Sequence, residues 1–185
     1  PPGAAARPRP SPTPGAVAVI SAESYADRYA TNLADVLRDA PGVYAQKKWG
    51  GDIRLSIRGS GIGNAVHNRG VLLAQDGVPL NEADGFGDFQ LIDPLIARYT
   101  EVYKGGNALR FGGALLGGAV NLVTAKPNGE LGGKFELSYG NFNYKRAKAV
   151  LNLPALGALS VKLSGQVTKR DGFYDIVSNP FPAAS

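Results

Sequence analysis

Three segments near the C-terminal end alternate apolar and polar residues, and this period of two constrains the fold more than any other feature. Residues 134–139, 146–153 and 161–168 place apolar side chains at alternate positions, with mostly charged, hydroxyl or amide side chains between them. Such a period is typical of antiparallel strands with one apolar and one polar face. The segments suit membrane-crossing strands, but a soluble sheet with one wet face gives the same pattern. Both alternatives are therefore open from these strands alone.

The part of the chain before these segments has shorter elements separated by glycine-rich turns. Asp76-Gly77 predicts a type I′ hairpin turn, and Thr31 or Asn32 predicts the N-cap of a helix that stops at Pro41-Gly42. Asp93 before Pro94 predicts a second short helix, and Ser21 can cap another. Strands are predicted at 17–20, 53–57, 71–75, 78–80, 99–104 and 119–124. We therefore expect an α+β chain, in which a small mixed sheet with short helices precedes about three antiparallel strands.

Residues 1–16 differ from both of these parts because they are rich in proline and small residues. Such a composition buries little apolar area and predicts an extended N-terminal linker. We expect three regions: this linker at 1–16, a first domain at 17–127, and the strands of a second, truncated domain at 128–185.

Composition argues against several classes of function. The chain has no cysteine and a single histidine, His67, so we expect no protein-held metal and no other cofactor. Its net charge of +5 comes from 20 basic and 15 acidic residues spread along the chain, so we expect no nucleic-acid partner. The glycine-rich runs lack the residues that complete a nucleotide-binding motif, and no spacing specifies a catalytic triad or carboxylate pair. We therefore expect no catalytic residues and no enzyme activity.

Five short segments occur in the order found in a known family of receptors. They are LRDAPGV at 37–43, IRG at 57–59, DGVPL at 76–80, EVYKG at 101–105 and GGAVNLVT at 117–124. In this order, followed by the alternating strands, they resemble the plug domain and first barrel strands of TonB-dependent outer-membrane receptors. The segment GGNALRFG at 105–112 is most similar to receptors of the ferric-dicitrate and siderophore type.

The resemblance implies a fold, a location and a function. The plug would lie in the lumen of a transmembrane β-barrel, of which this chain contains only the start, with its N-terminus in the periplasm. It would gate the import of a ferric chelate, such as a siderophore or ferric citrate, with energy from the TonB system. The partners implied are the chelate, outer-membrane lipid around the complete barrel, and the TonB energy-transducing protein. Because no energy-coupling motif is recognisable in 1–14, TonB is expected to engage a segment upstream of this chain.

The resemblance also suggests site residues. Plug cations of the family lie against barrel acids, which makes Arg58 and Lys104 candidates for locking the plug to the barrel; Lys104 stands where many members have Arg. Anionic, oxygen-rich chelates need basic, polar and aromatic groups, and we expect these on two loops at the outward apex, 59–70 and 81–90. The candidates for ligand binding are Asn64, His67, Asn68, Arg69, Phe86, Phe89 and Gln90.

Two other functions fit the sequence. One is a soluble binding or interaction module that reuses a plug-like fold without transport. The other is a TonB-dependent receptor for a different large nutrient, such as a cobalamin or a sugar.

Overall fold

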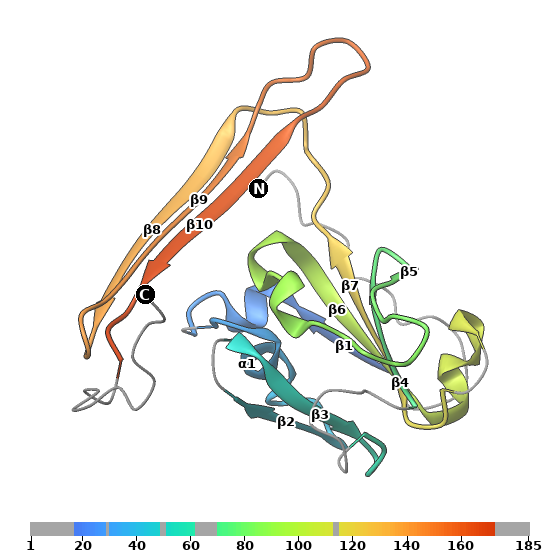
Figure 1. The fold of residues 1–185 in the computed structure, drawn as a ribbon. Coiled ribbons are helices and arrows are strands. Elements are labelled where there is room, and N and C mark those ends of the chain that lie inside the picture. Colours follow the sequence, from blue (N-terminus) through green and yellow to red (C-terminus); the bar gives the residue numbers. More distant parts are fainter. Residues whose placement is uncertain (1–16, 29, 49–50, 62–69, 113–114, 173–185) are drawn as a thin grey trace, which may run out of the picture. The chain divides into compact units, whose positions relative to one another are not determined.

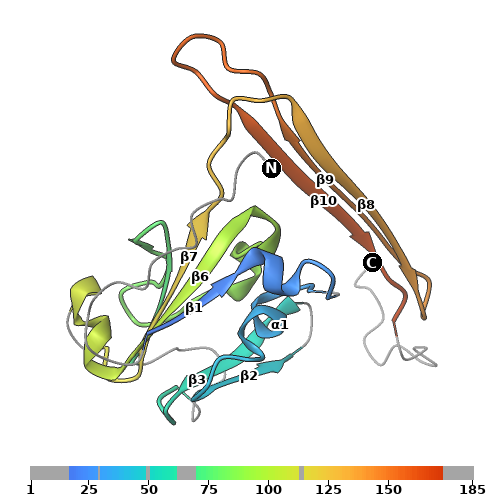
Figure 2. The same cartoon turned by 180° about the vertical axis from the view of Figure 1, so that it is seen from behind.

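The chain divides into two compact units, Pro1–Ala125 and Lys126–Ser185. The computed structural model describes residues 17–28, 30–48, 51–61, 70–112 and 115–172. Figures 1 and 2 show the ribbon from opposite sides. The predicted fold class is confirmed: a mixed sheet with short helices is followed by three antiparallel strands.

A five-stranded mixed sheet forms the centre of the first unit. Its strand order is β1-β6-β7-β4-β5, and all neighbours are antiparallel except β7 and β4, which are parallel. The strands are β1 (Val17–Ser21), β4 (Val71–Gln75), β5 (Val78–Pro79), β6 (Ala97–Lys104) and β7 (Gly118–Thr124). Asp76 and Gly77 both have positive φ, +52° and +84°, which confirms the predicted hairpin turn between β4 and β5.

The main core lies on one face of this sheet. The helix α1 (Leu33–Leu37) and the hairpin of β2 (Val43–Lys47) and β3 (Ile53–Ile57) lie side by side there. Their buried side chains join those of β4, β6 and β7 in a single cluster that includes Leu37, Leu55, Leu73, Val102 and Val120.

Short helical turns complete the first unit. Ser21 caps only one 3-10 turn, η1 (Ala22–Tyr25), so the prediction of a helix there holds for a single turn. Two more 3-10 turns, η3 (Phe89–Leu91) and η4 (Pro94–Ile96), precede β6. A longer 3-10 segment, η5 (Gly105–Phe111), follows β6 and provides Ala108 and Phe111 to a smaller apolar cluster that contains Tyr103 and Ala119. No helix of the described residues has the length and apolar character needed to cross a membrane.

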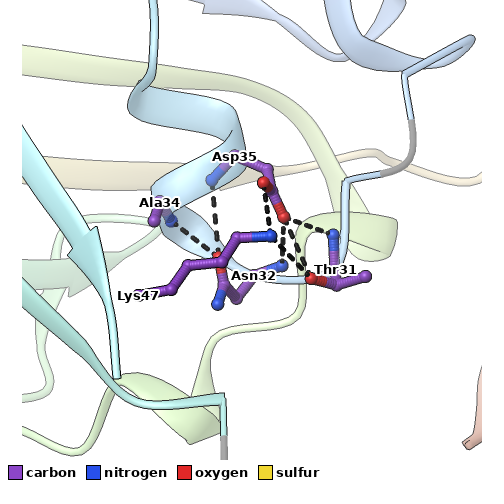
Figure 3. A network of polar contacts seen from close by, with 5 residues as sticks. All are labelled: Thr31, Asn32, Ala34, Asp35 and Lys47. Carbon is purple, nitrogen blue, oxygen red and sulfur yellow. Dashed lines mark hydrogen bonds and ion pairs between the residues drawn. The ribbon is translucent and has the colours of Figure 1, made fainter. Parts of the chain in front are cut away.

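The N-terminus of α1 is held by a polar network (Figure 3). The Asn32 side chain accepts from the backbone N–H groups of Ala34 and Asp35, and the Asp35 carboxylate accepts from those of Thr31 and Asn32. This reciprocal arrangement is a capping box, so Asn32 is the N-cap. Lys47 of β2 forms an ion pair with Asp35 at 2.7 Å, which ties the helix to the hairpin.

Acid should weaken this network. Burial acts to raise the pKa of Asp35, but hydrogen bonds from Lys47 and Thr31 outweigh it, so the pKa lies below its ordinary value of 3.8. A depressed carboxyl pKa contributes stability above the unfolded value and loses it as the pH falls through the folded value. We expect urea unfolding at pH values below 3.8 to show a smaller free energy of unfolding in the wild type. The Asp35→Asn variant should show a flatter pH dependence; equal slopes for the two proteins would contradict the prediction.

The second unit is a three-stranded antiparallel sheet in the order β10-β9-β8. The strands β8 (Gly132–Gly140), β9 (Tyr144–Asn152) and β10 (Lys162–Lys169) run side by side (Figure 2). The predicted short turn at Pro154–Gly157 belongs to the longer of the two connections, residues 153–161, whereas β8 and β9 are joined by residues 141–143. Phe142 and Asn143 adopt positive φ in that tight turn.

The register places the apolar residues of the three strands on one face, as their alternation predicts. Leu137 pairs with Ala147, which pairs with Val167, and Glu136 pairs with Lys148 on the opposite face. The apolar face is open: Leu137 is 71% exposed and Val167 is 74% exposed. On the polar face, Glu136 pairs with both Arg146 at 3.3 Å and Lys148 at 2.9 Å.

Candidate functional site

Two opposite ends of the five-stranded sheet organise the candidate residues. At one end, which we call the linker end, β1 begins at Val17, β6 ends at Lys104, and β4 and β7 begin at Val71 and Gly118. The residues that precede Val17 enter the domain here. At the other end, β1 ends, β6 begins and the β4–β5 turn lies beside Thr124, whose backbone N–H and hydroxyl donate to Asp76 at 2.8 and 2.5 Å.

Arg58 and Lys104 come together at the linker end. Arg58 follows β3 with a φ of +53° and is exposed, and its guanidinium lies beside Gly105, where an added Cβ would be 3.0 Å from Nη1. Lys104 is only 8% exposed. Within the described residues, neither side chain forms an ion pair with an acid. Two neighbouring cations without acids, one of them largely buried, are suited to receive a carboxylate from outside this part of the chain.

The described flanks of the 59–70 loop also lie at the linker end. The Gly70 carbonyl accepts from the backbone N–H groups of Gly117 and Gly118, at 2.9 and 3.1 Å. Ser60 and Ile57 exchange backbone hydrogen bonds directly after β3. The candidates within this loop, Asn64, His67, Asn68 and Arg69, lie outside the described residues.

The 81–90 loop reaches a different place. It starts against β4, where Asn81 accepts from the Leu73 N–H at 2.6 Å and donates to the Val71 carbonyl at 3.3 Å. It ends with Gln90, which is exposed and lies 4.0 Å from the position of a Cβ added to Gly51, in the β2–β3 turn.

β3 separates these two places. An extended strand rises about 3.3 Å per residue, so Gly51 before β3 and Arg58 after it lie roughly 20 Å apart. Gln90 lies with the β2–β3 turn, whereas Gly70 lies at the linker end. That both loops form one apex stays a prediction, because residues 62–69 lie outside the described residues. Sequence reasoning could not place Gln90 beside Gly51, because the position of the 81–90 loop depends on the strand pairing.

The three candidates of the 81–90 loop have different surroundings. Phe89 is 3% exposed and belongs to the main core, so its proposed role as a ligand contact is wrong in this structure. The reason is the 3-10 turn η3, capped by Asp88, which directs the Phe89 ring inward and leaves Gln90 exposed. Phe86 is half-buried, and its backbone N–H donates to Asp84.

The β2–β3 turn adds polar groups that the sequence analysis missed. Lys48 and Asp52 form an ion pair at 2.6 Å, and the Lys48 N–H donates to the Asp52 carbonyl at 2.8 Å. Both side chains are about one-fifth exposed, 20% and 19%. A lysine four residues before an aspartate, directly ahead of the alternating segment 53–57, was the available signal. We call this turn together with Gln90 the hairpin end.

No group of three or more His, Asp or Glu side chains in the described ranges is arranged to hold a metal ion. A chelate that arrives with its iron already coordinated needs no such group.

Comparisons with known proteins give a consistent result. A family model described as the TonB-dependent Receptor Plug Domain matches residues 9–119. The ferric enterobactin receptor of Pseudomonas aeruginosa is 29% identical over 179 residues, which cover 84% of this chain and 23% of the receptor. The vitamin B12 transporter of Vibrio vulnificus is 27% identical over 84% of this chain and 25% of the transporter.

A solved structure agrees with these matches. The crystal structure of a ferric enterobactin receptor variant from Pseudomonas aeruginosa superposes with a TM-score of 0.64 at 26% identity, covering 84% of this chain and 24% of that chain. The present chain therefore spans about a quarter of the length of the relatives that it matches.

Proposed function

Because the chain belongs to the TonB-dependent receptor family through a plug domain matched over residues 9–119, we propose that it is the gate of a transporter for a ferric chelate. Members of this family are outer-membrane transporters rather than enzymes. The chelate would be a siderophore or ferric citrate, and import would draw on the TonB system. The similarity to a receptor named for ferric enterobactin carries this choice of cargo.

The second unit supports a membrane role for the complete protein. Its apolar face exposes Phe135, Leu137 and Tyr139 by 66%, 71% and 79%. An exposed apolar face of this kind needs an apolar environment. The opposite face of the sheet is polar and carries the ion pairs of Glu136. We propose that β8, β9 and β10 begin a barrel, with the apolar face against outer-membrane lipid.

The plug would sit in the lumen of that barrel with the linker end toward the periplasm. The residues that precede Val17 enter at this end, and TonB would engage a segment upstream of them. With this orientation the hairpin end faces away from the periplasm. We propose that Lys48 and Gln90 form the ligand-facing part of the plug, because a cation and an amide suit an anionic, oxygen-rich chelate. Phe86 stays a candidate from the sequence.

The cargo can be tested with the complete receptor in a strain that lacks its own iron receptors. We expect uptake of radioactive iron from a ferric catecholate or citrate, and loss of uptake when TonB is deleted. Uptake of labelled cobalamin in place of iron would instead favour the second function, for which the similarity to a vitamin B12 transporter is the supporting observation.

A pair of double variants tests the ligand-facing end. Replacing both Lys48 and Gln90 by Ala in the complete receptor should weaken chelate binding about tenfold, the effect of losing roughly 1.4 kcal/mol of polar contacts. Replacing His67 and Arg69 by Ala tests the 59–70 loop in the same assay. Lys126→Ala, at an exposed position shortly after β7, is the charge-matched control. Weaker binding only in the His67 and Arg69 variant would reverse the assignment of the two ends.

A further inference from the structure

Arg110 is a cation that the proposed gate does not yet use. It lies in η5, is exposed, and stacks on two aromatic rings: its guanidinium carbon is 5.2 Å from the centroid of Tyr103 and 5.5 Å from that of Phe111. Its Nη1 donates to the Tyr103 hydroxyl at 3.2 Å. The two rings meet edge to face, with centroids 5.1 Å apart. The guanidinium is therefore held in one orientation by neutral groups.

A chain of hydrogen bonds fixes this arrangement on the sheet. The Tyr103 hydroxyl donates to Glu101, which also accepts from the Asn121 side chain at 2.9 Å. Asn121 in turn accepts from the backbone N–H of Gly77 at 2.9 Å. Burial, together with the Glu101 carboxylate, raises the pKa of Tyr103 to about 12, so the hydroxyl stays protonated and keeps this donor.

The guanidinium has donors left for a partner. It has five N–H groups in a planar fork, and its one hydrogen bond within the described residues is to Tyr103. The nearest carboxylate of the network, Glu101, already accepts from Tyr103 and Asn121. Leu109, the preceding residue, is 63% exposed. An oriented arginine beside an exposed leucine has the composition of an interface anchor.

We propose that Arg110 binds a carboxylate on the inner wall of the complete barrel, on a strand beyond those described here. This inference rests on the proposed position of the plug in the barrel lumen. There, burial of the guanidinium would require an acid. The described strands do not offer one: their acid on the polar face, Glu136, is engaged by Arg146 and Lys148. Since this chain spans about a quarter of its relatives' length, most of the wall lies outside it.

This contact differs from that of Arg58 and Lys104. Lys104 follows Tyr103 in β6 and so lies on the other face of the sheet. Arg110 would therefore fasten a second side of the plug.

Cross-linking in the complete receptor tests the proposal. A photo-cross-linking amino acid in place of Leu109 should link to a barrel peptide of the same molecule that contains Asp or Glu, as identified by mass spectrometry. A link only to a separate periplasmic protein, or no link while the same probe at Phe111 does react, would overturn it.

Variants give an independent readout. Arg110→Glu should increase the rate of protease cleavage of the plug in outer-membrane vesicles about tenfold, and Arg110→Lys should fall between it and the wild type. A charge reversal of the cross-linked acid should restore protection to the Glu variant. Unchanged cleavage, or no restoration, would overturn the proposal. If the wild type itself fails to take up any ferric chelate while the cross-link forms, the proposed cargo fails and the contact stands.

Discussion

Replacing Gly118 by Ala is expected to destabilise the plug domain strongly. Gly118 is the first residue of β7 at the linker end and has a φ of +149°, a conformation that side chains disfavour. An added Cβ would overlap the Tyr103 carbonyl oxygen and lie 3.1 Å from Ile57 Cδ1. Tyr103 belongs to β6, which pairs with β7, and Ile57 is a fully buried core residue of β3, so neither can move without disturbing strand pairing or core packing. Overpacking and backbone strain together should cost about 3–5 kcal/mol, against a total stability of roughly 5–15 kcal/mol.

Thermal unfolding of the 185-residue chain, followed by circular dichroism, measures this effect. Gly106→Ala is the matched control, because its Cβ would meet nothing within 4 Å and its φ is not positive. It should change the stability by less than about 1 kcal/mol. A Gly118→Ala variant that unfolds at the same temperature as the Gly106→Ala control would contradict the prediction. It would show that β6 and β7 can separate at Gly118 at little cost in free energy.

Replacing Lys104 by Met is expected to have opposite effects in the isolated chain and in the complete receptor. In the chain, the largely buried ammonium has no acidic partner among the described residues, so an apolar side chain of similar length should leave stability unchanged or raise it by about 1 kcal/mol. In the receptor, the proposed barrel carboxylate would lose its partner. Breaking one side of a buried ion pair costs about 3–5 kcal/mol.

The test of Lys104 is whether Lys104→Met changes stability in opposite directions in the isolated chain and in the complete receptor. Chain stability can be followed by urea unfolding, and receptor stability by the urea concentration that exposes the plug to protease. Lys126→Met, at an exposed position shortly after β7, should leave both stabilities unchanged. A destabilisation of similar size in both proteins would mean that Lys104 serves the plug itself, and the locking role would fail.

Local signals in the sequence predicted most of the elements. Asp76-Gly77 was sufficient for the hairpin turn, because few dipeptides accept positive φ at both positions. Asn32 was sufficient for the start of α1, because its side chain bonds to backbone N–H groups two and three residues away. In the second unit, alternation alone assigned each residue to the apolar or the polar face.

Elements whose existence depends on a distant partner were harder to predict. The strand β2 was missed because Val43–Lys47 has little alternation of its own and becomes a strand by pairing with β3. Phe89 looked like a loop aromatic, yet one turn of 3-10 helix places it in the core. Lys48 and Asp52 were not predicted as site residues, because no local sequence signal shows that Gln90 lies beside their turn.

The sequence by itself therefore determined the elements, the turn chemistry and, through its ordered motifs, the family. Only the tertiary structure decided which loops share an end of the domain. A period of two reports that one face of a strand is buried, but it carries no information about which strand pairs with it. The parallel pairing of β4 with β7 joins residues more than 40 positions apart, as the register of Val71 with Gly118 shows. That pairing, with the direction of β3, brings Arg58 to Lys104 and leaves Gln90 at the opposite end of the hairpin.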